Sequence, residues 1–197
     1  MKNRFHGDGM GRRLFHLVGC LVLAILALVI SRDLFLWLLL SLATAFLLVD
    51  VIRLTWPVVN RLFVQLFSCL MRQQETTGLN ASTYVLVGSL LTLLLFDRDI
   101  AVAGLIFLGA GDAIAGMVGE RWGRHKLLNK SLEGTAAFFI FSLVVGLIFK
   151  YVALDISLGV LLLGALSAAI VELLPLPVND NLTIPLLSAA IMTGLAL

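Results

Sequence analysis

Seven runs of apolar residues, each about long enough to cross a bilayer, fill most of this chain and constrain its fold more than any other feature. A membrane-spanning helix needs about 17–25 predominantly apolar residues. Inside hydrocarbon the backbone must satisfy its own hydrogen bonds, so runs of this length predict helices. The chain is 60% apolar and only 13% charged, whereas soluble domains are about a quarter charged. We therefore expect one integral-membrane domain over residues 1–197, with spans at residues 14–30, 34–52, 79–96, 100–118, 135–153, 156–174 and 182–197.

An eighth stretch, residues 56–71, has a different pattern. Asn60, Arg61, Gln65 and Ser68 recur at helical spacing among valine, leucine and phenylalanine. Such a pattern is typical of an amphipathic helix that lies in the interface rather than across it. The predicted fold class is all-α: a polytopic membrane bundle of about seven transmembrane helices plus one interfacial amphipathic helix.

The basic residues predict how this bundle is oriented. Eleven of the fourteen lysines and arginines fall on one side: four before the first run, three in the second connection and four in the fourth. Cytoplasmic connections are enriched in these residues, so the N-terminus is expected in the cytoplasm and the C-terminus outside. The polar clusters at residues 12–16, 75–80, 112–133 and 172–181 then share the cytoplasmic face, where we expect the active site.

Asp112 is the most informative of these polar residues, because it lies at the edge of an apolar run. A carboxylate in hydrocarbon costs about 2.5–3.5 kcal/mol on insertion scales, which favours a metal or a partner charge beside it. Mg²⁺ prefers such oxygen ligands and bridges to substrate phosphates, and we favour this role over a structural hydrogen bond. Gly116 and Gly119 follow on the same helical face, where they either allow close helix packing or leave room for a ligand.

Lys130 and Ser131 stand immediately before a predicted span. Ser131 is suited to cap that helix, with Glu133 as the nearby carboxylate. The helix start would reinforce anion binding, so Lys130 is expected to contact phosphate. Lys126 could join it, or could belong to a basic connection that only touches lipid headgroups.

Two more carboxylates and two further clusters are predicted on the same face. Asp180 could be a plain helix cap, but beside Asp112 it becomes a second metal-ligand candidate, while Glu172 needs a cationic partner such as Lys130 or an arginine. The remaining candidates are two clusters, one before the first span and one before the third: Arg12, Arg13 and His16, and Glu75 and Asn80. Thr77 is suited to cap the third span, whereas Glu75 and Asn80 could hold ribose or a phosphate-bound metal.

In this order along the chain, these clusters resemble the motifs of the CTP-dependent polyprenol kinases, which include dolichol, phytol and farnesol kinases and a CTP-using diacylglycerol kinase. Arg13 stands where a lysine is common. The resemblance covers most of residues 12 to 185 and rests on Arg12-Arg13-x-x-His16, Glu75-x-Thr77-Gly78, Gly111-Asp112-x-x-Ala115-Gly116-x-x-Gly119, Gly123-Arg124-x-Lys126, Lys130-Ser131-x-Glu133-Gly134 and Asp180-Asn181-Leu182-x-Ile184-Pro185.

The resemblance implies a membrane enzyme that transfers the γ-phosphoryl group of CTP to the hydroxyl of a polyprenol or related lipid alcohol. Mg²⁺ would be held by Asp112 and Asp180, with Glu172 as a third carboxylate; Lys130 would be catalytic, and His16 or a carboxylate would accept the alcohol proton. The residues expected around the nucleotide are Arg12, Arg13, Glu75, Asn80, Gly116, Gly119, Lys126, Ser131 and Glu133.

Two other functions stay open at this point. The more distantly similar phosphatidate cytidylyltransferases also use CTP but make a CDP-lipid. A transporter with Asp112 on its ion path is less favoured, because the charges gather at one face and no repeated half is visible. We expect CTP and a lipid within the bilayer as partners and no nucleic acid; a homo-oligomer is compatible with the sequence.

Overall fold

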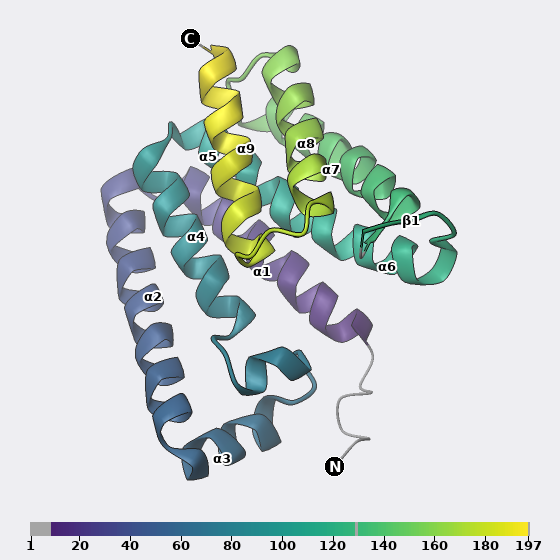
Figure 1. The fold of residues 1–197 in the computed structure, drawn as a ribbon. Coiled ribbons are helices and arrows are strands. Elements are labelled where there is room, and N and C mark those ends of the chain that lie inside the picture. The colour runs from purple at the N-terminus through teal and green to yellow at the C-terminus, as the bar shows by residue number, and fades with distance from the viewer. Residues whose placement is uncertain (1–8, 129, 197) are drawn as a thin grey trace.

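The computed structural model describes residues 9–128 and 130–196, which form a bundle of helices and one small hairpin (Figure 1). The elements in chain order are α1 (Gly9–Val29), α2 (Arg32–Thr55), α3 (Pro57–Phe67), η1 (Gln73–Thr76), α4 (Ala81–Leu95), α5 (Arg98–Ile106), η2 (Phe107–Gly111), α6 (Asp112–Trp122), β1 (Lys126–Leu127), β2 (Lys130–Ser131), α7 (Leu132–Val152), α8 (Leu158–Leu173) and α9 (Asp180–Ala196). The all-α class predicted from the sequence is confirmed.

Each predicted apolar run contains a helix, but the count of seven spans is not confirmed. Within the described residues, four helical stretches are long and apolar enough to cross a bilayer: α1, α2, α7 and the continuous stretch Arg98–Trp122. Helices α4 and α8 are apolar but shorter, at 15 and 16 residues.

The centre of the bundle is the stretch made of α5, η2 and α6. Seventy-eight per cent of its most apolar part is buried, against 22% or less in the other three long helices. Small side chains let α1, α4, α7 and α9 pack around it. The five residues of η2 form a π-helical turn directly before Asp112, and such turns are frequent at functional sites.

Helix α3 matches the amphipathic helix predicted at residues 56–71. It begins with Pro57 at a position where the missing N–H costs nothing. Figure 1 shows α3 turned sharply away from α2 at the lower end of the bundle, and none of its residues is buried. This geometry suits a helix that lies along an interface.

A two-stranded antiparallel hairpin, β1 with β2, connects α6 to α7 and was not expected from the sequence. Leu128, between the strands, has a φ of 58°, a left-handed conformation that is uncommon outside glycine. Each strand has only two residues, too few for an alternating pattern to be visible in the sequence.

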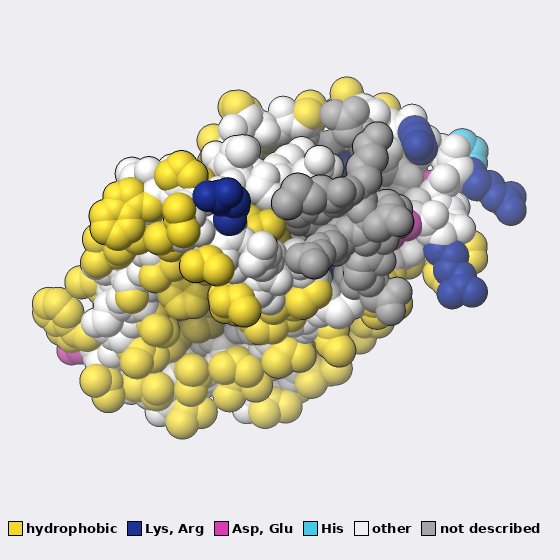
Figure 2. Space-filling model, turned by 90° about the horizontal axis from the view of Figure 1, so that it is seen from below, with side chains coloured by type: hydrophobic (Ala, Val, Ile, Leu, Met, Phe, Trp, Pro, Cys, Tyr) yellow, Lys and Arg dark blue, Asp and Glu magenta, His cyan; other side chains and the backbone are white. Residues whose placement is uncertain are grey.

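The outer surface carries large apolar side chains on nearly every helix. In Figure 2 hydrophobic side chains cover much of the visible face, while most of the visible lysine and arginine side chains and a histidine lie at the end where α6 and β1 lie in Figure 1. A soluble monomer rarely exposes apolar area on this scale, so this surface indicates a membrane protein.

Candidate functional site

A cavity of about 610 Å³ brings together polar residues from seven separate parts of the chain. These parts are the beginning of α1, the connection between α3 and η1, α6 from its first residue onward, the hairpin, the beginning of α7, the end of α8 and the beginning of α9. The predicted site residues that line it are Arg12, Arg13, His16, Asp112, Gly116, Gly119, Lys126, Lys130, Ser131, Glu172 and Asp180. The expected convergence of Asp112 and Lys130 is therefore observed.

Lys130 joins two of the carboxylates. Its Nζ donates to Glu172 Oε1 and to Asp180 Oδ2, both at 2.9 Å, and also to the Glu172 carbonyl oxygen. Burial by itself would lower the pKa of Lys130, but the two carboxylates outweigh it and hold that pKa above its ordinary value. The cation predicted to accompany Glu172 is thus Lys130, and it remains charged.

Asp112 and His16 are neighbours in the cavity lining. His16 Nε2 lies 3.8 Å from Asp112 Oδ2, which is too long for a direct hydrogen bond, and 3.8 Å from the Sγ of Cys20. Within residues 9–128 and 130–196, no hydrogen bond to the Asp112 carboxylate is formed. Both of its oxygens are therefore available to a ligand.

The carboxylates can hold a metal ion only together with other ligands. Among the described side chains, no group of three His, Cys, Asp or Glu residues is close enough to enclose one. However, the buried Glu172 Oε2 has no hydrogen-bond partner there, and Asp112 lines the same cavity. Two carboxylate ligands fit Mg²⁺, which usually keeps several waters and completes its shell with substrate phosphates. Asp180 already binds Lys130 through one oxygen.

The arginines of α1 point toward the cavity. Arg13 pairs with the exposed Glu120, whereas the Arg12 guanidinium makes no ion pair or hydrogen bond with the part of the chain described here. A third guanidinium, that of Arg72, lines the cavity as well. Arg72 is another of the three basic residues of the second connection, and nothing in its local sequence distinguishes it from an ordinary topogenic charge.

The glycines of α6 serve close packing of side chains around the cavity. A Cβ on Gly116 would lie 2.8 Å from Arg13 Nε, and one on Gly119 would lie 2.9 Å from Ser131 Oγ. On α7, a Cβ on Gly134 would lie 2.9 Å from the carbonyl oxygen of Ala115. Gly116 therefore leaves room for an arginine, and Gly119 and Gly134 let α6 and α7 approach.

Ser131 caps α7 as predicted, since its Oγ accepts a hydrogen bond from the Gly134 N–H at 3.1 Å. Glu133 points elsewhere. Its carboxylate lies 2.7 Å from His125 Nδ1 and accepts from the His125 N–H at 3.2 Å. Glu133 does not line the cavity.

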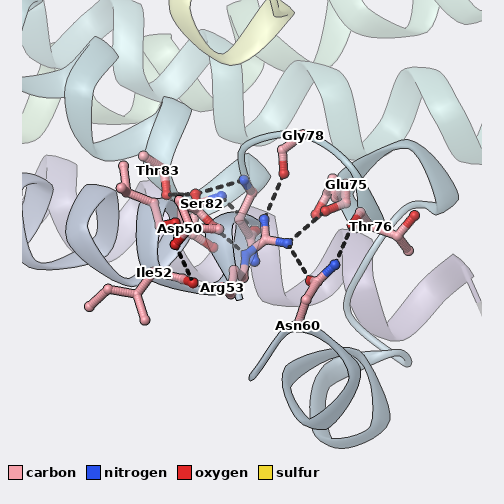
Figure 3. Close-up of polar contacts among 12 residues, drawn as sticks. Asp50, Ile52, Arg53, Asn60, Glu75, Thr76, Gly78, Ser82 and Thr83 are labelled. Atoms are coloured by element: carbon pink, nitrogen blue, oxygen red, sulfur yellow. Dashed lines mark hydrogen bonds and ion pairs between the residues drawn. The ribbon is translucent and has the colours of Figure 1, made fainter. Parts of the chain in front are cut away.

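Glu75 and Asn80 are also outside the cavity lining and belong to a neighbouring cluster (Figure 3). Asn80 caps α4 by accepting from the Ser82 N–H at 3.1 Å, and its own N–H donates to Asp50 Oδ2 at 2.9 Å. Glu75 is 7% exposed, and this burial raises the pKa of its carboxyl group.

The centre of this cluster is a buried ion pair that sequence reasoning missed. Arg53, one of the three basic residues assigned above to the second connection, lies inside α2 and is 0% exposed, and Asp50 is 1% exposed. Arg53 Nε donates to Asp50 Oδ1 at 2.6 Å. The sequence did contain a signal for this pair. An acid and a base stand three residues apart at the end of an apolar run, and charges in that position need partners.

Comparison with known proteins adds independent information. The CTP-dependent diacylglycerol kinase 1 of Schizosaccharomyces pombe is 30% identical over 166 residues, which cover 73% of this chain and 72% of that protein. The protein of the same name from Saccharomyces cerevisiae is 28% identical over 208 residues, 93% of this chain and 72% of its own. A phytol kinase of Synechocystis is 35% identical over 98 residues, 46% of this chain and 42% of that enzyme. No protein-family model and no solved structure matches the chain.

Proposed function

Because the chain belongs to the family of CTP-dependent polyprenol and lipid kinases, we propose that it transfers the γ-phosphoryl group of CTP to the hydroxyl of a lipid alcohol. The observation that carries the proposal is the single cavity shared by Arg12, Arg13, Asp112 and Lys130. These residues are far apart in the sequence, and together they present cations and a free carboxylate at one end of an apolar bundle.

The cations would bind the triphosphate. Arginine matches phosphate oxygens with two parallel hydrogen bonds, and Arg12 has no partner in the described structure that it would need to give up. Lys130, fixed by Glu172 and Asp180, would direct its charge at the transferred phosphoryl group. Phosphoryl transfer depends mainly on such positioning and charge neutralisation.

Mg²⁺ fits Asp112 and the unpartnered Glu172 Oε2, with Asp180 as the third predicted carboxylate. When bound there it would neutralise charge on the phosphates. The chain's own part is to keep Asp112 free of hydrogen bonds at the end of the π-helical turn and to hold Glu172 through Lys130.

His16 is the residue we propose to accept the alcohol proton. Glu172 and Asp180 already accept hydrogen bonds from Lys130, whereas the His16 ring forms no hydrogen bond with an oxygen of the described residues, its Nε2 lying 3.8 Å from Asp112 Oδ2. In the transfer, the bond between Pγ and its bridging oxygen breaks, the lipid oxygen bonds to Pγ, and the hydroxyl proton passes to His16. CDP leaves.

The acceptor would approach from the bilayer and CTP from the cytoplasm. This orientation rests on the predicted positive-inside distribution of charge, and places the N-terminus inside and the C-terminus outside. A polyprenol or related alcohol is the proposed acceptor class. The fungal relatives above are named for diacylglycerol and the cyanobacterial relative for phytol, so both belong in the acceptor screen.

The test is a product analysis. Purified protein in lipid nanodiscs is given CTP labelled at the γ-phosphate, Mg²⁺ and one alcohol at a time: a polyprenol, phytol or diacylglycerol. Label in a lipid monophosphate together with CDP would support the proposal. Pyrophosphate with a CDP-lipid would establish the cytidylyltransferase alternative, and no turnover of CTP with any acceptor would refute both.

A further inference from the structure

We propose that Arg72 is an additional phosphate-binding residue of the cavity and that the buried Arg53 is the positioning residue that holds Arg72 there. This inference rests on the proposed phosphoryl transfer from CTP, and it concerns two residues that the sequence alone placed among ordinary topogenic charges.

Arg72 lines the same cavity as Arg12 and Lys130, although it comes from the connection between α3 and α4. In residues 9–128 and 130–196, neither the Arg72 nor the Arg12 guanidinium finds a carboxylate within ion-pair distance. Two like charges facing one cavity repel each other, and a polyanion bound between them would remove that repulsion. A triphosphate suits two guanidinium groups, since each can take a pair of phosphate oxygens.

The backbone at Arg72 is held by a series of hydrogen bonds that leads to Arg53. The Arg72 carbonyl oxygen accepts from the Glu75 N–H at 3.0 Å. In turn, Arg53 Nη1 donates to the Glu75 carbonyl at 3.0 Å and Arg53 Nη2 donates to the Gly78 carbonyl at 2.7 Å. Figure 3 shows the Arg53 guanidinium between these two carbonyls. One buried side chain therefore fixes the segment that presents Arg72.

The other hydrogen-bond partners of Arg53 hold the same segment. Asn60 on α3 accepts from Arg53 Nη1 at 3.2 Å and donates to the Thr76 carbonyl at 2.9 Å. Asp50 Oδ2 accepts from the Asn80 N–H and from Thr83 Oγ1, at 2.9 and 2.6 Å. The network thus links α2 and α3 to the segment that connects α3 with α4.

We assign this network a positioning role rather than a stabilising one. A fully buried ion pair is often no more stabilising than well-packed apolar side chains, because desolvation offsets the attraction. Its distinctive property is directional: the guanidinium offers a planar, rigid set of donors. Here both Nη atoms of Arg53 donate to backbone carbonyls of the segment next to Arg72.

The first experiment replaces Arg72 with glutamine and measures turnover against CTP concentration. We expect the KM for CTP to rise about tenfold or more while kcat changes little, since one charged phosphate contact is lost from the ground state and the transition state alike. Arg72→Lys should recover part of the loss. The matched control is Arg61→Gln, on the exposed surface of α3 and outside the cavity, which should leave the KM unchanged. An unchanged KM in Arg72→Gln would overturn the assignment.

The second experiment tests positioning. Arg53→Lys keeps the charge opposite Asp50 but loses the donors to the two carbonyls, so the KM for CTP should rise. The double variant Arg53→Lys/Arg72→Gln should have the KM of Arg72→Gln alone, because Arg53 acts through Arg72. Multiplied effects would show that Arg53 acts by another route and would overturn the positioning role. Should Arg53→Lys not fold, Asn60→Leu, which removes only the support at Thr76, is used in the same cycle with the same two outcomes.

The proposed function and this inference fail in different ways. Wild-type protein that does not use CTP refutes the function. CTP binding, measured as thermal stabilisation without acceptor, still tests Arg72: stabilisation in Arg72→Gln equal to that of the wild type refutes the inference, and a loss supports it.

Discussion

Replacing Lys130 with methionine should destabilise the bundle by an amount that follows from its contacts. Lys130 is the one cation within ion-pair distance of Glu172 in the described residues. The Glu172 side chain is 7% exposed, so the variant leaves a buried carboxylate without its counter-charge. Breaking a buried pair in this way costs about 3–5 kcal/mol. Because the side chains of Lys130 and Asp180 are each 30% exposed, we take the lower end, about 3 kcal/mol.

The pH dependence of this difference has a definite sign. The pKa of Lys130 is raised above the ordinary 10.5, because the carboxylates outweigh burial. The stabilisation from its charge is therefore complete below pH 10.5 and is lost as the pH rises through the raised pKa. Between pH 7 and 9 the gap between wild type and variant should stay constant, and it should close at higher pH.

The assay is thermal unfolding of purified protein in nanodiscs at pH 7. About 3 kcal/mol corresponds to a Tm lower by roughly 6–12 °C in a chain of this size. Lys130→Met/Glu172→Gln removes the unpaired charge and should recover about half of the loss. Lys150→Met is the control, since Lys150 donates to the Ile156 carbonyl and forms no ion pair within the described residues. A double variant no more stable than Lys130→Met would refute the reasoning.

Three further outcomes are expected. Asp112→Asn should abolish phosphoryl transfer while leaving the Tm within about 2 °C of wild type, because the carboxylate has no hydrogen bond to lose; both are measured on one preparation, and retained turnover would remove Asp112 from the metal site. Gly134→Ala should cost about 1–3 kcal/mol, since the new Cβ would lie 2.9 Å from a backbone oxygen of α6, whereas Gly194→Ala meets nothing within 4 Å and should be neutral in the same thermal assay; equal losses would contradict the packing. The raised pKa of Glu75 means that its contribution to stability falls as the pH rises from 4.5 through that pKa, so the wild-type Tm should drop over this range relative to Glu75→Gln, and parallel curves would contradict it.

The sequence was informative wherever a long pattern carried the signal. Apolar runs predicted every major helix, and the polar residues at their ends predicted most of the cavity lining, because helix ends on one face of a bundle meet in space. Ser131 as a cap and Lys130 as the partner of Glu172 followed from residue type and position.

What could not be predicted depended on few residues or on tertiary contacts. The hairpin has strands of only two residues, too short for periodicity. Arg53 and Asp50 are buried by packing between α2 and α4, so Arg53 was mistaken for a loop charge. Glu75 and Asn80 were expected around the nucleotide because they are polar residues at the start of a span on the same face, whereas Asn80 caps α4 and its N–H donates to Asp50.

The unequal helix lengths have a consequence for the membrane around the protein. At 1.5 Å per residue, the 24 residues of α2 rise about 36 Å, whereas the 16 residues of α8 rise only about 24 Å, less than the roughly 30 Å of a typical hydrocarbon core. Glu172 lies in the last turn of α8. In a bilayer as thick as α2 is long, the part of the cavity next to Glu172 would then lie below the level of the lipid headgroups. CTP would have to enter to that depth, and the hydroxyl of the lipid alcohol would not have to reach the membrane surface. The rate of phosphoryl transfer would therefore depend on bilayer thickness.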